Sequence, residues 1–221
     1  MVDILDEVEE DIRQERMVNA VRRYGGFVVL AAILVVAAVA GQEIWQSHLN
    51  NIAQKNATQY LALTKAVDQP DGTVTPAVAK DTAEKLVSFA GQASETYKTL
   101  ARMRAASLYA EVNDTNKAAA LWTRVAADEA APTQIRDVAN LLWAQHELAT
   151  AKSTDVLARL QLMTQQNNPY HGLARELQAM VYLHEGNIAM AKSFFAQVQD
   201  DPTVASGTRS RAAAMLTQLN G

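Results

Sequence analysis

The pattern of apolar and polar positions divides the chain into two contrasting parts. Residues 24–42 contain no charged side chain, and most of them are Val, Leu, Ile, Ala or Phe. As a helix this run extends for roughly 28 Å, close to the ~30 Å hydrocarbon thickness of a bilayer. Beyond it, apolar residues recur at helical spacing among polar ones, with no strand-like alternation. The pattern therefore predicts one apolar helix followed by a series of amphipathic helices.

Three interpretations of the apolar run remain open. Ala38-Val39-Ala40 before Gly41 has the small-residue form of a signal-peptide cleavage site, which would release the rest of the chain. A helix buried in a soluble core is the second interpretation, but no other segment is apolar on all sides to match it. The preceding residues 1–23 are longer and more acidic than a signal n-region. We therefore favour the third interpretation, a permanent transmembrane anchor over residues 24–43.

Arginines and a tryptophan at the two ends of the run predict its orientation. Four arginines precede it, and no Lys or Arg follows until Lys55. Basic residues flanking a membrane helix stay on the cytoplasmic side, so we expect residues 1–23 to form a cytosolic head. Arg22, Arg23 and Trp45 are the expected membrane-interface residues, because arginine and tryptophan suit the headgroup regions.

The segment after the anchor repeats itself. Shifting the sequence by 73 positions sets residues 173–198, LARELQAMVYLHEGNIAMAKSFFAQV, on residues 100–125, LARMRAASLYAEVNDTNKAAALWTRV, without a gap. In each copy an aromatic residue is followed by a small residue and then a second large aromatic: Tyr109, Ala118 and Trp122 in one, Tyr182, Ala191 and Phe195 in the other. A small residue lets two helices approach closely, and the later aromatic fills the gap toward the next pair. This pattern predicts helix pairs stacked in sequence.

Weaker copies of the pattern extend the series in both directions. Because 73 is about twice the 34-residue period of a tetratricopeptide repeat, a further unit is expected between the two copies. Arg136, Ala139 and Trp143 fit its first helix, whereas Lys152 stands where alanine is expected. Another unit includes Tyr60 and Ala83, Thr75-Pro76 is a helix start, and residues 203–219 form a closing helix. We predict an all-α fold with the boundaries 1–23 head, 24–43 anchor, 44–75 connecting helix and loop, and 76–221 repeat domain.

Composition and motifs give no sign of catalytic chemistry. The chain has 20 basic and 24 acidic residues, which argues against general nucleic-acid binding, and without cysteine it has neither disulfides nor thiolate ligands. Its four histidines lack a metal-binding spacing, and it has no phosphate-binding glycine loop or serine elbow. We expect no enzyme activity, metal, cofactor or small-molecule substrate, although an enzyme or ligand-binding domain with a less obvious pocket remains an alternative.

Arg102, Arg136 and Arg175 recur seven residues before an aromatic residue in each unit. In one interpretation their stems cover the neighbouring aromatic ring while the guanidinium reaches water. In the other they line a concave face and contact acidic or backbone groups of a partner protein. These three arginines are the candidate partner-binding residues.

The units resemble tetratricopeptide repeats over residues 45–219, although arginine replaces the first-helix tryptophan of that family and alanine replaces its glycine. Trp45-Gln46-Ser47-His48 after the anchor, the Ala57-x-x-Tyr60 helix and the order of elements resemble the YfgM family, ancillary subunits of the bacterial Sec translocon. That resemblance implies an inner-membrane protein whose repeat domain lies in the periplasm, binds the SecYEG channel and periplasmic chaperones, and assists the hand-over of translocated chains. The alternative is a periplasmic repeat protein, cleaved after Ala40, that works with cell-envelope or cell-division machinery.

Overall fold

The computed structural model describes residue 36 and residues 39–68 and 74–221. Head residues 1–23, with Arg22 and Arg23, lie outside the described residues, as does most of the predicted anchor 24–43. Within the described ranges all regular structure is helical, as predicted, and no helix there is both long and apolar enough to cross a membrane. The chain divides into two compact units, residues 1–55 and residues 56–221. Trp45 belongs to the first unit and is exposed.

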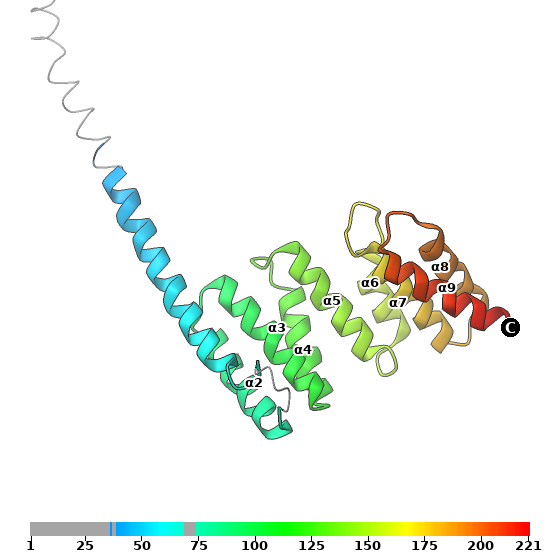
Figure 1. The fold of residues 1–221 in the computed structure, drawn as a ribbon, viewed down its shortest axis with the longest axis horizontal. Coiled ribbons are helices and arrows are strands. Elements are labelled where there is room, and N and C mark those ends of the chain that lie inside the picture. The colour runs from blue at the N-terminus through cyan, green and yellow to red at the C-terminus, as the bar shows by residue number, and fades with distance from the viewer. Residues whose placement is uncertain (1–35, 37–38, 69–73) are drawn as a thin grey trace, which may run out of the picture. The chain divides into compact units, whose positions relative to one another are not determined.

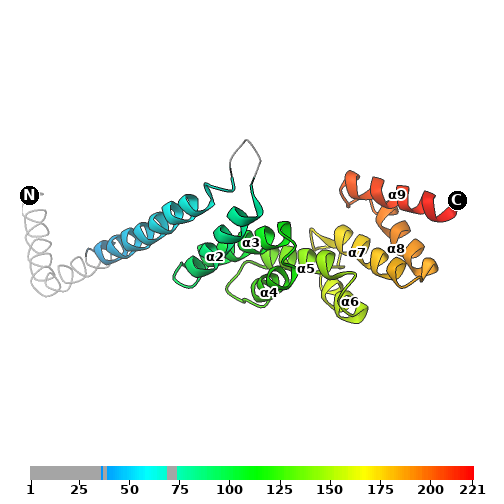
Figure 2. The ribbon, with the colours of Figure 1, turned by 90° about the horizontal axis from the view of Figure 1, so that it is seen from below.

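Residues 39–64 form a continuous helix, which confirms the predicted helix after the apolar run. In the second unit each helix from α2 onward packs against the next helix in sequence (Figure 1, Figure 2). Two pairs of alternate helices, α5 with α7 and α7 with α9, are also in contact. The helices are α2 (Pro76–Ala90), α3 (Glu95–Glu111), α4 (Thr115–Ala126), α5 (Thr133–Glu147), α6 (Ser153–Gln161), α7 (His171–His184), α8 (Ile188–Asp200) and α9 (Ser206–Asn220).

Local sequence explains where the helices begin and turn. Thr75 caps α2 by accepting a hydrogen bond from the N–H of Val78, and Pro76 occupies the first position, as predicted. The turns inside the two similar copies have a residue with positive φ, Asn113 at 61° and Gly186 at 75°. Glycine adopts that conformation without strain and asparagine tolerates it better than most residues, so the chain reverses at these positions.

In the described part of the chain the core consists of three apolar clusters placed along the series. One joins α2 to α5, the second joins α5 to α7, and the third joins α7 to α9. Ala118 and Ala191 are fully buried on the second helix of each copy, and Trp122 and Phe195 fill the space one turn later. The predicted role of the small residue and the following aromatic is thus confirmed.

The middle pair, α5 and α6, departs from the other two. Lys152 is the N-cap residue of α6, lies outside the helix and makes no side-chain cap hydrogen bond. The connection from Leu162 to α7 is also longer than the connections before α5 and α9. At the end of the series, α9 is the closing helix that was expected over residues 203–219. Its Ala212 is buried as part of the third cluster.

Candidate partner-binding site

Two of the predicted partner-binding arginines already have an acidic neighbour within the domain. Arg102 donates to Asp128, and Arg175 donates to Asp201, each across 3.0 Å and each over a separation of 26 residues. Both aspartates also accept the backbone N–H of the residue two positions later, at 3.2 and 3.0 Å. The two copies therefore share a clamp that ties the first helix to the connection after the second. Neither sequence interpretation included this internal contact.

Arg136, the equivalent residue of the middle pair, has no such aspartate. The residue 26 positions later is Leu162, whose side chain is 71% exposed. Within the described ranges the only side-chain hydrogen bond of Arg136 runs from Nη2 to Thr133, at 3.2 Å, and its buried Nε has no partner. Partner binding by the three arginines stays a prediction, but their environments differ sharply.

Asp201 lies at the centre of a larger polar cluster. Its carboxylate accepts hydrogen bonds from the hydroxyl of Thr203 and from Arg175, and His171 Nε2 lies 3.3 Å away. The hydrogen bonds from the side chain and the backbone of Thr203 hold the pKa of Asp201 below its ordinary value, and the nearby His171 acts in the same direction. His171 is buried, and its Nδ1 lies 2.7 Å from the backbone oxygen of Asn168, which can only accept. The cluster fixes the start of α7 against the connection before α9.

A pocket of about 270 Å³ opens where the alternate helices α5, α7 and α9 meet. Its wall is largely apolar, and the polar groups lie on three different helices. This volume is below the range of about 300–1,000 Å³ typical of small-molecule sites, so the pocket suits a single side chain of a partner better than a whole ligand. The residues that form the apolar wall are Leu141, Leu173, Leu177 and Met180.

One ion pair determines the polar character of this pocket. Arg211 of α9 binds Glu176 of α7 with two hydrogen bonds, of 2.8 Å from Nε and 2.7 Å from Nη2. The Glu176 side chain is only 5% exposed, whereas that of Arg211 is 55% exposed. Hydrogen bonding to Glu176 raises the pKa of Arg211 above its ordinary value. The guanidinium is charged, as arginine always is in proteins, and its Nη1 is left without a hydrogen bond in the described part of the chain.

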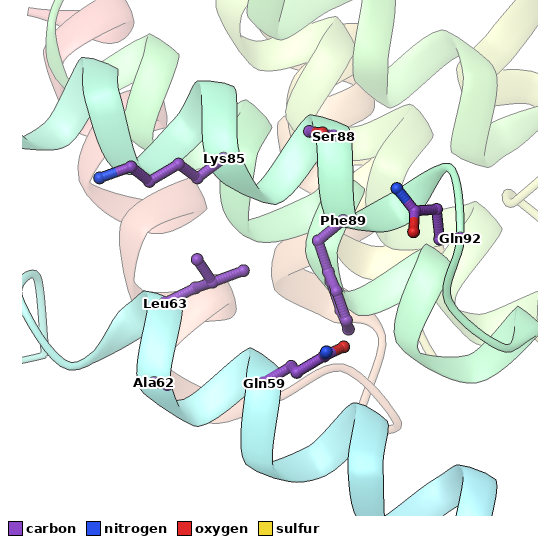
Figure 3. A pocket seen from close by; sticks show the side chains of 7 residues that line it. All are labelled: Gln59, Ala62, Leu63, Lys85, Ser88, Phe89 and Gln92. Carbon is purple, nitrogen blue, oxygen red and sulfur yellow. The ribbon is translucent and has the colours of Figure 1, made fainter.

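A larger depression, of about 460 Å³, lies between residues 59–63 and α2 (Figure 3). Phe89 points from α2 toward Gln59 of the facing helix, and Leu63 also borders the gap. Lys85 is the single charged residue in its lining, and it is paired with Asp81 at 2.6 Å. No other charged group converges here, so we place the candidate site at the α5, α7 and α9 pocket.

Comparison with protein families decides how these helix pairs are classified. A scan against family models matches residues 21–218 to the tetratricopeptide repeat-like domain. The chain belongs to this family. Searches of curated proteins and of solved structures found no significant match. Tetratricopeptide repeat-like domains are protein–protein interaction modules, and this agrees with a pocket that offers shape and polar anchors.

Several polar residues of this tetratricopeptide repeat-like domain were not predicted from the sequence. Asp128 and Asp201 also coincide under the shift of 73, just beyond the aligned segments. Arg209 lies one repeat period of 34 residues after Arg175, and its buried Nε lacks a hydrogen-bond partner among the described residues. The ion pair of Glu176 and Arg211 gave no periodic signal in the sequence, because it joins two neighbouring units and is not repeated in the other copy.

Proposed function

We propose that this protein is a non-catalytic interaction scaffold held in the inner membrane by one transmembrane helix over residues 24–43. In this proposal the N-terminus faces the cytoplasm, and the repeat domain lies in the periplasm. There the protein acts as an ancillary subunit of the Sec translocon, which passes translocated chains to periplasmic chaperones. The observation that supports the scaffold role most directly is the pocket among α5, α7 and α9 in a tetratricopeptide repeat-like domain.

The pocket has the groups needed to hold an unfolded chain without recognising one sequence. Its apolar wall accepts a large aliphatic or aromatic side chain, and burying such a side chain contributes about 1.5–3 kcal/mol. Arg211 Nη1 lies beside it and is free to donate to a backbone carbonyl of the same segment. Since every peptide has that carbonyl, many chains satisfy these two requirements.

Membrane anchoring would allow the pocket to act on translocated chains even if it binds each of them weakly. A single span confines the domain to the same plane as a channel, which raises its effective concentration there without any additional contact. The uncharged run 24–42, the arginines before it and the resemblance to the YfgM family support this part of the proposal. SecYEG and periplasmic chaperones are accordingly the proposed partners.

Co-purification in a mild detergent tests the proposed partner. Full-length protein should recover the translocon channel, whereas a variant without residues 1–42 should recover much less of it. Absence of the channel from the full-length sample would remove the Sec assignment and leave the scaffold role standing.

A matched pair of substitutions tests the pocket. Leu173 borders it and is 37% exposed, while Leu100, its counterpart under the shift of 73, is 40% exposed and lies outside it. Leu173→Glu should weaken crosslinking to unfolded client chains several-fold, and Leu100→Glu should leave it unchanged. Helicity by circular dichroism should be the same for both variants. Equal crosslinking by the two would argue against the pocket.

A second candidate is a periplasmic repeat protein, released by cleavage after Ala40, that works with cell-envelope or cell-division machinery. The Ala38-Val39-Ala40 sequence is the observation that favours it. Mass spectrometry of the protein isolated from cells distinguishes the two, because a mature N-terminus at Gly41 supports release and an intact N-terminus supports the anchor.

A further inference from the structure

The repeat provides two arginines with an internal carboxylate and leaves the third without one. Arg102 and Arg175 each bind an aspartate 26 residues later, at 3.0 Å. The residue 26 positions after Arg136 is Leu162, which has no carboxylate. We propose that Arg136 binds a carboxylate on an acidic side chain of a partner protein, in the role that Asp128 and Asp201 have in the other units. This inference rests on the proposed function only in requiring that the domain bind protein chains.

The state of the Arg136 side chain supports this assignment. Its buried Nε has no hydrogen-bond partner, and Nη2 reaches only the neutral hydroxyl of Thr133. An unpaired buried donor is unfavourable, and the cost is larger for a charged group than for a neutral one. A carboxylate is the natural partner for a guanidinium, because it accepts two parallel N–H bonds. An incoming acidic side chain would bind the Nη groups, which have no internal carboxylate among the described residues, whereas the buried Nε stays out of its reach.

The surroundings of Arg136 also favour a negative ligand. It lies near the N-terminus of α5, whose first turn contains no acidic residue and whose N-cap residue, Pro132, makes no side-chain cap. Uncapped N–H groups at a helix start carry partial positive charge. The nearest acid in sequence, Asp137, accepts a hydrogen bond from Asn168 at 2.8 Å and forms no ion pair with Arg136. No internal carboxylate among the described residues thus competes for the guanidinium.

The proposal extends to Leu162, which is 71% exposed at the end of α6 and belongs to the same helix pair as Arg136. An exposed leucine offers apolar area to a bound segment. In this proposal the partner segment alternates acidic and apolar residues. This surface is separate from the α5, α7 and α9 pocket, whose lining does not include Arg136.

A direct binding measurement on the full-length protein in mild detergent tests the proposal. The probe is a fluorescent peptide of alternating glutamate and leucine with a blocked N-terminus and an amidated C-terminus. Arg136→Gln should weaken its binding by about tenfold or more, as expected for a lost charge-assisted hydrogen bond. Arg124→Gln, at an exposed residue of α4 outside the candidate partner-binding set, is the matched control. It should keep the peptide affinity within about twofold of the wild type.

Two further peptides identify the recognised group. Replacing each glutamate by glutamine should abolish the difference between the wild type and Arg136→Gln. A glutamine–leucine peptide with a free C-terminal carboxylate should also bind both proteins equally, and preferential binding of this peptide to the wild type would overturn the assignment to an acidic side chain. Unchanged affinity of Arg136→Gln for the glutamate peptide, or an equal loss of affinity in Arg124→Gln, would likewise overturn the proposal. Because recovery of the translocon is measured separately, either result leaves the proposed function to its own test.

Discussion

Arg175 and Asp201 join the first helix of their unit to the connection after the second helix, across 3.0 Å. Arg102 and Asp128 make the same contact one copy earlier, at the same distance. Because each aspartate also accepts a backbone N–H in its own turn, the pair fixes both the helix and the turn. The clamp is thus a structural element of the repeat.

Loss of this clamp should destabilise the domain. Asp201→Asn keeps the shape of the side chain and removes its charge, leaving Arg175 and His171 without their anionic partner. We expect the free energy of unfolding to fall by about 1–3 kcal/mol. Chemical denaturation followed by circular dichroism measures the change. Glu129→Gln, at an exposed residue of the connection before α5, is the control and should be neutral.

The same residue predicts a dependence of stability on pH. The folded-state pKa of Asp201 lies below its ordinary value of 3.8, because Thr203 donates hydrogen bonds to the carboxylate. A depressed pKa means that this contribution to stability is present above about pH 3.8 and is lost as the pH falls toward the folded-state pKa. The difference in thermal midpoint between the wild type and Asp201→Asn should therefore narrow below pH 4. A difference that stays constant down to pH 2.5 would contradict the assigned ionisation.

Gly172 should not tolerate even one methyl group. A Cβ at this position would lie 2.5 Å from Cγ1 of the buried Val204, so Gly172→Ala should cost about 1–3 kcal/mol. Gly207→Ala is the control, because nothing lies within 4 Å of its added Cβ. In a Val204→Ala background the cost of Gly172→Ala should shrink, and thermal melts of the four proteins measure this coupling. Full additivity would show that the clash is relieved elsewhere.

Trp122 should accept phenylalanine at little cost. The ring is buried, but the indole N–H has no hydrogen-bond partner within the described chain, and Phe195 already occupies the equivalent position of the other copy. Removing an unsatisfied donor offsets part of the stability lost with the smaller side chain. Trp122→Phe should therefore lower the free energy of unfolding by less than about 1.5 kcal/mol. Trp122→Ala should cost about 3–5 kcal/mol. Urea denaturation distinguishes the two, and similar losses would indicate that the indole N–H is satisfied in solution.

Leu162→Asp should restore the missing clamp. The new carboxylate would stand 26 residues after Arg136, as Asp128 and Asp201 stand after their arginines. We expect a gain of about 1 kcal/mol in the free energy of unfolding, measured by denaturation, with Leu162→Ala as the control. An unchanged stability would show that the longer connection before α7 turns position 162 away from Arg136.

Periodicity made much of the repeat domain predictable. The shift of 73 identified the positions of Ala118 and Ala191, and both are fully buried in the core. Asn113 and Gly186 also correspond under this shift, and both have positive φ angles. These features depend on short-range spacing, which a single sequence displays directly.

The polar contacts were harder to predict because they depend on packing between units. Arg175 was singled out by its spacing, yet its partner lies 26 residues away in a turn with no hydrophobic pattern. The pairing of Glu176 with Arg211 crosses from α7 to α9 and has no counterpart in the other copy. Such a contact arises only when the angle between two helices is fixed, and neither residue type indicates that angle.

Because its apolar clusters are separate, we expect this domain to unfold in steps, not in a single cooperative transition. The cluster that holds α8 and α9 shares no buried residue with the one that joins α2 to α5. Stacked units of this kind unfold in steps set by their nearest neighbours. We therefore expect the C-terminal helix to detach and reattach while the first helices stay folded, and each detachment would separate Arg211 from Glu176. Hydrogen exchange should accordingly proceed faster at this end of the domain than at α3 and α4.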